Sequence, residues 1–111
     1  MLDPEIIKNH IRVELDFSED DALLETYATA AQRYAENYTG RTLYATKTEV
    51  PKDPEDKRAL VLDDDITTAM LLLIGHWYAN RESVVIGTTA SEVPMAVEAL
   101  LAPYRHFFFD L

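Results

Sequence analysis

The stretch that decides the fold of this chain is Asp63-Asp64-Asp65-Ile66-Thr67-Thr68-Ala69-Met70-Leu71-Leu72-Leu73-Ile74. Its three carboxylates favour a helix start, because acidic side chains interact well with the positive end of the helix dipole. The following run leaves no polar face in its middle turn, which is typical of a helix buried on all sides. It is shorter than the roughly 20 apolar residues of a membrane span. We therefore predict a buried central helix over residues 63–82, covered by the rest of the chain or partly by a neighbouring subunit.

Two helices are predicted before this stretch. Asp3 followed by Pro4 favours a helix start, because the aspartate can accept a free amide and proline is preset for the first helical position. The second helix is expected over residues 19–38, with a capping-box-like start at Ser18 and an end at Gly40, which can adopt the left-handed cap conformation. Its apolar face is defined by spacings of three and four. That face comprises Leu23, Leu24, Tyr27, Ala28, Ala31, Tyr34, Ala35 and Tyr38.

The segments before and after the central helix are predicted to have different structures. Residues 42–50 are rich in β-branched and aromatic types, which favours a short strand or extended arm, and residues 59–62 a brief return strand of a two-stranded ribbon. After the central helix, residues 83–92 are expected to form a loop. Val93 and Pro94 then restart a helix, which Pro103 ends.

The resulting fold class is mostly α. We predict a single domain over residues 1–111, a small bundle of about four helices around the central helix, with a short extended arm or β-ribbon at about 42–62. The expected core comprises Leu23, Tyr27, Tyr34, Tyr38, Ile66, Met70, Leu73, Ile74, Trp77, Val97 and Leu100.

Composition limits the possible partners. Twenty acidic and ten basic residues give a formal net charge of -10, which opposes attachment to phosphates because such affinity comes mainly from Lys and Arg. The chain has no cysteine, so it has no disulfide or thiolate metal site. Its start has neither the basic nor the apolar region of a signal peptide, so export is not expected.

No catalytic, cofactor-binding or metal site is predicted. The consecutive residues Asp63, Asp64 and Asp65 point in different directions on a helix start and lack the spacing of a calcium loop. The three histidines are widely separated in the sequence. His76 and Glu82 lie six residues apart, face different ways and have no nucleophile motif beside them.

Apolar residues outside the helices are the candidate interface. Three adjacent phenylalanines cannot all face one core, so the aromatic tail either folds back in part or docks on a partner, where aromatic residues are favoured anchors. The apolar loop after the central helix has the same two alternatives, packing on its own core or docking on a partner. The candidate residues are Tyr44, Val84, Val85, Ile86, Tyr104, Phe107, Phe108 and Phe109.

Most of the chain resembles one family, the small helical head-tail connector of tailed bacteriophages, also called the phage DNA-packaging or head-completion protein. The resemblance rests on the strings at residues 10–13, 20–24, 37–41, 76–82 and 93–105, which are His-Ile-Arg-Val, Asp-Asp-Ala-Leu-Leu, Asn-Tyr-Thr-Gly-Arg, His-Trp-Tyr-Ala-Asn-Arg-Glu and Val-Pro-Met-Ala-Val-Glu-Ala-Leu-Leu-Ala-Pro-Tyr-Arg. Residues 42–60 and the aromatic end are the least similar parts.

The resemblance implies a structural virion assembly protein and no enzyme. Its copies would form a cyclic, dodecameric ring that docks on the phage portal after DNA packaging, contacts downstream tail or neck proteins and lets DNA pass without sequence-specific binding or membrane contact. It would reside in the neck of the virion, and in the bacterial host cytoplasm before assembly. Free phage and prophage remain equally open. The alternative hypothesis is an acidic DNA mimic or inhibitor that binds a basic protein, which the net charge permits.

Overall fold

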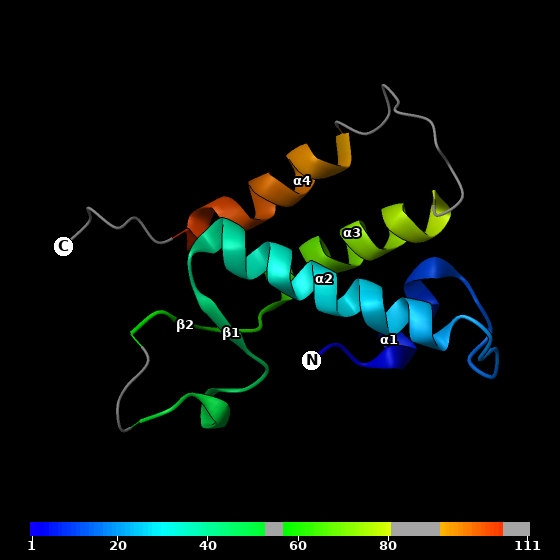
Figure 1. Ribbon diagram of the computed structural model, residues 1–111. Coiled ribbons are helices and arrows are strands. Elements are labelled where there is room, and N and C mark those ends of the chain that lie inside the picture. The colour runs from blue at the N-terminus through cyan, green and yellow to red at the C-terminus, as the bar shows by residue number, and fades with distance from the viewer. Residues whose placement is uncertain (53–56, 81–91, 106–111) are drawn as a thin grey trace.

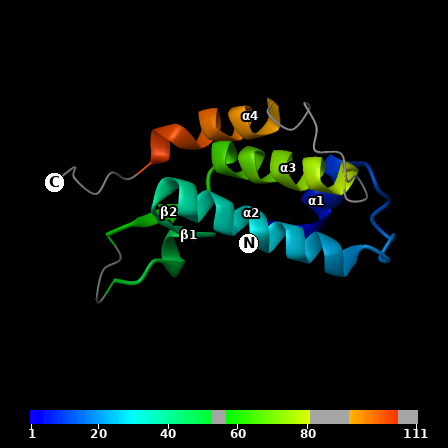
Figure 2. The ribbon, with the colours of Figure 1, turned by 45° about the horizontal axis from the view of Figure 1, so that its top comes forward.

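The computed structural model describes residues 1–52, 57–80 and 92–105. The helices are α1 (Pro4–Ile11), α2 (Asp21–Thr39), α3 (Asp64–Ala79) and α4 (Glu92–Leu101), and two short 3-10 helices are η1 (Lys47–Glu49) and η3 (Ala102–Tyr104). Helix α3 lies between α2 and α4 and also contacts α1 (Figures 1 and 2). The predicted mostly helical bundle around a central helix is confirmed.

The ends of α1 and α2 follow the sequence signals with one exception. The Asp3 side chain accepts a hydrogen bond from the amide of Glu5 at 2.9 Å, and Gly40 ends α2 in the left-handed conformation with φ 69°. The predicted capping box at Ser18 is wrong, because α2 begins at Asp21 and its N-cap residue, Asp20, makes no side-chain cap bond. The Asp20 carboxylate instead accepts a 2.7 Å hydrogen bond from the Tyr78 hydroxyl of α3. The contact with Tyr78, which is 58 residues away, thus takes the place of a side-chain cap at the start of α2.

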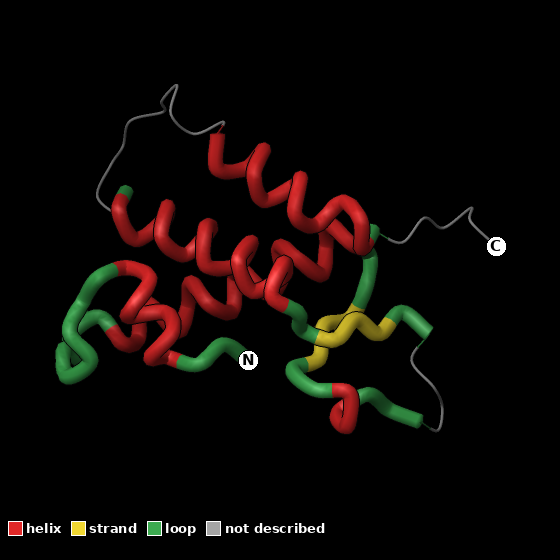
Figure 3. The backbone as a smooth tube through the Cα atoms, turned by 180° about the vertical axis from the view of Figure 1, so that it is seen from behind, coloured by secondary structure: helices red, strands yellow, loops and turns green. Residues whose placement is uncertain are grey.

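The arm contains two strands, β1 (Thr42–Tyr44) and β2 (Ala59–Val61), at one end of the bundle (Figure 3). They pair in parallel, with Leu43 opposite Leu60, so the predicted return direction is wrong. Strand composition does not specify direction, and the connection over residues 45–58 is long enough for the crossover of about a dozen residues that parallel strands need. The Glu36 carboxylate accepts a 2.9 Å hydrogen bond from the Leu43 amide, which ties β1 to α2.

The central helix is shorter and less enclosed than predicted. It ends at Ala79, where the Asn80 side chain donates a 2.8 Å hydrogen bond to the His76 carbonyl, and residues 81–82 of the predicted helix lie outside the described residues. Leu71 and Leu72 are only half-buried, so burial on all sides is wrong for the single chain. Three helices pack around α3, and three neighbours leave part of its circumference uncovered.

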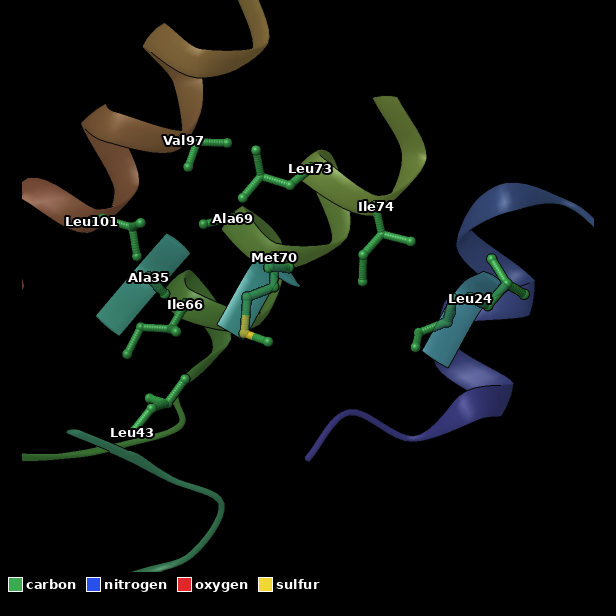
Figure 4. Close-up of a cluster of buried hydrophobic side chains, with 12 residues drawn as sticks. Leu24, Ala35, Leu43, Ile66, Ala69, Met70, Leu73, Ile74, Val97 and Leu101 are labelled. Carbon is green, nitrogen blue, oxygen red and sulfur yellow. The ribbon is translucent and has the colours of Figure 1, made fainter. Parts of the chain in front are cut away.

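One cluster of buried apolar side chains joins α1, α2, α3, α4 and β1 (Figure 4). Of the expected core residues, Ile66, Met70, Leu73, Ile74 and Val97 are buried, and Tyr27, Tyr34, Tyr38, Trp77 and Leu100 are partly buried against them. Leu23 is an exception, because it is half-buried outside the cluster while its neighbour Leu24 is buried. Leu24, Ala31 and Ala35, which belong to the expected apolar face of α2, are the buried apolar residues of that helix. Met95 of α4 is 67% exposed.

Candidate subunit and partner interface

Two surface features stand out as candidate interfaces, one at the C-terminal end of α2 and one along its first twelve residues. The first is the place where the described chain ends, beside the C-terminal end of α2 (Figures 1 and 2). The second is a groove between α1 and the N-terminal part of α2. Because they are distinct patches, they meet the requirement for a head-to-tail contact between identical copies.

The first feature is a set of contacts that we call the C-terminal cluster: Tyr38, Arg41, Asp65, Tyr104 and Arg105. Arg41 follows Gly40, the C-cap residue of α2, and its Nε donates a 2.6 Å hydrogen bond to the Tyr104 carbonyl. The Tyr104 hydroxyl donates a 3.0 Å hydrogen bond to Asp65 at the start of α3. The Arg105 guanidinium lies 5.0 Å from the centre of the Tyr38 ring. The chain therefore leaves the bundle from a fixed point.

The hydrogen bond between Tyr104 and Asp65 also affects the ionisation of the Tyr104 phenol. The hydrogen bond to Asp65 raises the pKa of the Tyr104 phenol above its ordinary value, and the negative charges of Asp65 and Asp63 raise it further. The phenol therefore remains a protonated donor at neutral pH. Its contribution to stability is present below the ordinary tyrosine pKa and is lost as the pH rises through the raised pKa.

Replacing Arg41 with methionine tests the first tie. The methionine cannot donate to the Tyr104 carbonyl, so we expect the free energy of unfolding to fall by about 1–2 kcal/mol, measured by chemical denaturation. Arg33→Met is the matched control, because Arg33 is an exposed arginine of α2, and its effect should stay within about 0.5 kcal/mol. Equal losses in the two variants would show that Arg41 does not fix the chain end.

The second feature, the α1–α2 groove, has a volume of about 580 Å³. It exists because α1 packs mainly against α3 and stands away from α2. Its apolar lining includes the buried residues Ile7 and Leu24 and the half-buried residues Leu2 and Ala28. The remaining lining residues are Met1, Pro4, Lys8, Asp21, Glu25, Thr29 and Gln32. The groove thus combines an apolar interior with a polar rim.

Lys8 fixes one wall of this groove. Its Nζ donates hydrogen bonds to the carbonyls of Phe17 at 2.7 Å and Leu15 at 3.2 Å, and lies 3.0 Å from an Asp21 carboxylate oxygen. One ammonium group thereby holds the turn between α1 and α2 and the first residue of α2. Only 10% of this lysine side chain is exposed, so the contacts form in a partly desolvated place.

Two of the candidate interface residues lie in the described part of the chain. Tyr44 is half-buried on β1, and Tyr104 is half-buried in the C-terminal cluster. They lie on different elements, Tyr44 on β1 and Tyr104 on η3. The other six candidates, Val84, Val85, Ile86, Phe107, Phe108 and Phe109, lie outside the described residues.

Sequence reasoning missed the groove, Lys8 and Arg41. The groove results from the way two helices pack, and no local pattern encodes it. Arg41 finds its partner 63 residues away. Of these features, only Lys8 had a recognisable signal in the sequence, because a lysine beside the apolar residues Ile7 and Ile11 of a short helix indicates partial burial.

The described residues give no indication of a metal or membrane site. Within residues 1–52, 57–80 and 92–105, no three His, Cys, Asp or Glu side chains are grouped so that they could hold a metal ion. None of the helices in those ranges is both long and apolar enough to traverse a bilayer.

Comparison with known proteins gives one result. The sequence model of the family described as phage gp6-like head-tail connector protein matches residues 4–105, a range that begins at the first residue of α1 and ends in the C-terminal cluster. No curated protein and no solved structure matches the chain.

Proposed function

The chain belongs to the family of phage gp6-like head-tail connector proteins, and from this premise we propose that it is the protomer of a closed ring that docks on the portal of a phage head. The family places the protein between head and tail, in the neck of the virion. The observation that carries the proposal is the extent of the match, which covers all four helices and both strands. We further propose that residues 1–111 act as a single domain, which assembles in the bacterial host cytoplasm after the genome has been packaged.

The arrangement of the surface supports a cyclic assembly. A ring made of identical copies needs two different patches on each copy, and the α1–α2 groove, whose lining on α2 ends at Gln32, and the C-terminal cluster, which begins at Tyr38, are two such patches. The half-buried residues Leu71 and Leu72 of α3 add apolar surface that a neighbour can cover. The family resemblance suggests a dodecamer. The remaining interface candidates, including the 83–92 loop and the aromatic tail, belong to the same proposal.

The charge of the chain supports a conduit for DNA. A net charge of -10 would repel phosphates, so DNA could pass through the ring without adhering to it or being read. Downstream tail or neck proteins would then bind the exposed face of the ring. In this proposal the protein has no catalytic role and needs no cofactor.

Native mass measurement of the full chain, alone and mixed with its portal protein, tests the proposed function. We expect a closed ring of identical copies, bound to the portal in the mixture. A ring held by apolar contacts should persist when the salt concentration is raised, since salt screens mainly exposed charges. A chain that stays monomeric with its portal would refute the proposal.

The same measurement distinguishes the alternative, an acidic DNA mimic. The excess of twenty acidic over ten basic residues favours that hypothesis. It predicts a monomer or dimer that binds a basic protein and is released by salt. A salt-resistant ring would exclude it.

A further inference from the structure

We propose that Phe107, Phe108 and Phe109 of one copy insert into the α1–α2 groove of the neighbouring copy and thereby link the ring. This inference rests on the proposed ring and names the contact that closes it. The occupant is a segment of the chain itself, residues 106–109, which follow directly after the last described residue.

The groove suits aromatic side chains. Its volume of about 580 Å³ lies within the range of about 300–1,000 Å³ that is typical of protein binding pockets. Ile7, Leu24 and Ala28 provide an apolar interior, while Asp21, Glu25 and Thr29 form an exposed rim. Buried aromatic anchors surrounded by a polar rim are the usual source of binding energy at protein interfaces.

The position of the chain end determines which copy is reached. Arg41 holds the Tyr104 carbonyl just beyond the end of α2, and Arg105 lies on the Tyr38 ring. The described chain therefore ends, at Arg105, beside the end of α2 that is farthest from α1 (Figures 1 and 2). The last described residues are thus held at the C-terminal end of α2, whereas the groove lies along the preceding part of that helix, from Asp21 to Gln32.

Distances along α2 favour a neighbouring copy over the same copy. With a rise of about 1.5 Å per residue, Ala28 and Leu24 lie about 16 and 22 Å from Thr39 at the end of the helix. A fully extended chain gains at most about 3.6 Å per residue, so the backbone at Phe107 to Phe109 is within about 7–14 Å of Arg105. The backbone of the tail therefore stops short of the level of Ala28 and Leu24 in the groove of its own copy, whereas Gln32, the lining residue nearest to the tail, lies about 10 Å from Thr39. In a head-to-tail ring, the groove of the next copy can lie beside the tail.

The absence of cysteine from the chain permits a direct test by disulfide trapping. Two single variants of the full chain, Phe108→Cys and Ala28→Cys, are mixed, assembled with the portal and oxidised. A disulfide between the two different chains can only be intermolecular. We expect this mixed dimer to form, and mass spectrometry of the digested product to show the 28–108 link.

Ala30→Cys is the matched control for Ala28→Cys. Both are alanine-to-cysteine changes on α2, and they lie about 200° apart around the helix, so only residue 28 lines the groove. Ala30 is exposed and Ala28 is half-buried, so random collision would favour residue 30. The proposal predicts the opposite order, with a several-fold higher yield for residue 28.

Each outcome supports or overturns the inference. If rings form but residue 28 links no better than residue 30, the tail contact is wrong and the proposed function stands. If the double variant Ala28→Cys/Phe108→Cys forms its disulfide within one chain, the tail folds back and the inference is again overturned. If no ring forms with the portal, the proposed function fails, and this inference fails with it.

Removing the aromatic rings provides a second test that needs no cross-link. Changing Phe107, Phe108 and Phe109 together to alanine should shift the native mass from ring to monomer while the helical content stays unchanged. Met95→Ala removes another exposed apolar side chain outside the groove and should leave the ring intact. Rings of normal size from the triple variant would overturn the inference.

Discussion

Replacing Ile74 with alanine should lower the free energy of unfolding by about 2–5 kcal/mol, the largest effect that we expect from a single substitution. Ile74 is 0% exposed and belongs to the cluster that includes Ile7 of α1 and Leu24 of α2 (Figure 4). The loss combines the lost burial of the removed carbons with the cavity left behind. Because α3 is contacted by the other three helices, the surrounding chain cannot readily collapse into that cavity.

Chemical denaturation at one fixed protein concentration measures this effect, since assembly would itself stabilise the folded chain by mass action. Ile74→Val keeps most of the volume and should cost only about 0.5–1.5 kcal/mol. Met95→Ala, at a position that is 67% exposed, should change stability by less than about 0.5 kcal/mol. An Ile74→Ala loss as small as that of Met95→Ala would mean that α3 is not the centre of the core.

Replacing Lys8 with methionine should cost about 2–3 kcal/mol, because three partners lose one charged donor. Methionine keeps the apolar stem and removes the ammonium group that binds the Leu15 and Phe17 carbonyls and the Asp21 carboxylate. The two carbonyls would keep their partly buried positions without that donor. We expect the turn between α1 and α2 to loosen, which faster hydrogen exchange around residues 13–20 would report.

Lys47→Met is the matched control for this prediction. Lys47 is exposed on η1, so its replacement should change the free energy of unfolding by less than about 0.5 kcal/mol. If the two variants lose the same stability, or if exchange in the turn is unchanged in Lys8→Met, the structural role of Lys8 is refuted. Because Lys8 also lines the groove, its loss should weaken ring formation as well.

Local patterns in the sequence predicted much of the helical architecture. The Asp3-Pro4 start of α1, the glycine end of α2 at Gly40 and the carboxylate-rich start of α3 depend on residues within one turn of each boundary. Such short-range effects act before any tertiary contact forms. The family resemblance came from strings spread over the same elements, and the match over residues 4–105 confirms it.

The errors arose where a distant residue competed with a local signal. Asp20 accepts a hydrogen bond from Tyr78 instead of forming part of the expected capping-box-like start at Ser18, and Leu23, which was expected in the core, is only half-buried. The direction of β2 was also wrong, because the same residue types form parallel and antiparallel strands. Tyr78 lies 58 residues from Asp20, and Ala59 of β2 lies 17 residues after its partner Thr42 of β1, so neither contact belongs to a local pattern.

The sequence by itself determined the helices, the acidic charge and the family, because propensity, capping and composition depend on residues close together in the chain. Only the tertiary structure decided the α1–α2 groove, the role of Lys8 and the fixed exit of the chain at Arg41. These features depend on how far α1 stands from α2 and on a contact that spans 63 residues. No local pattern contains that information, since packing brings such residues together only after the helices have formed.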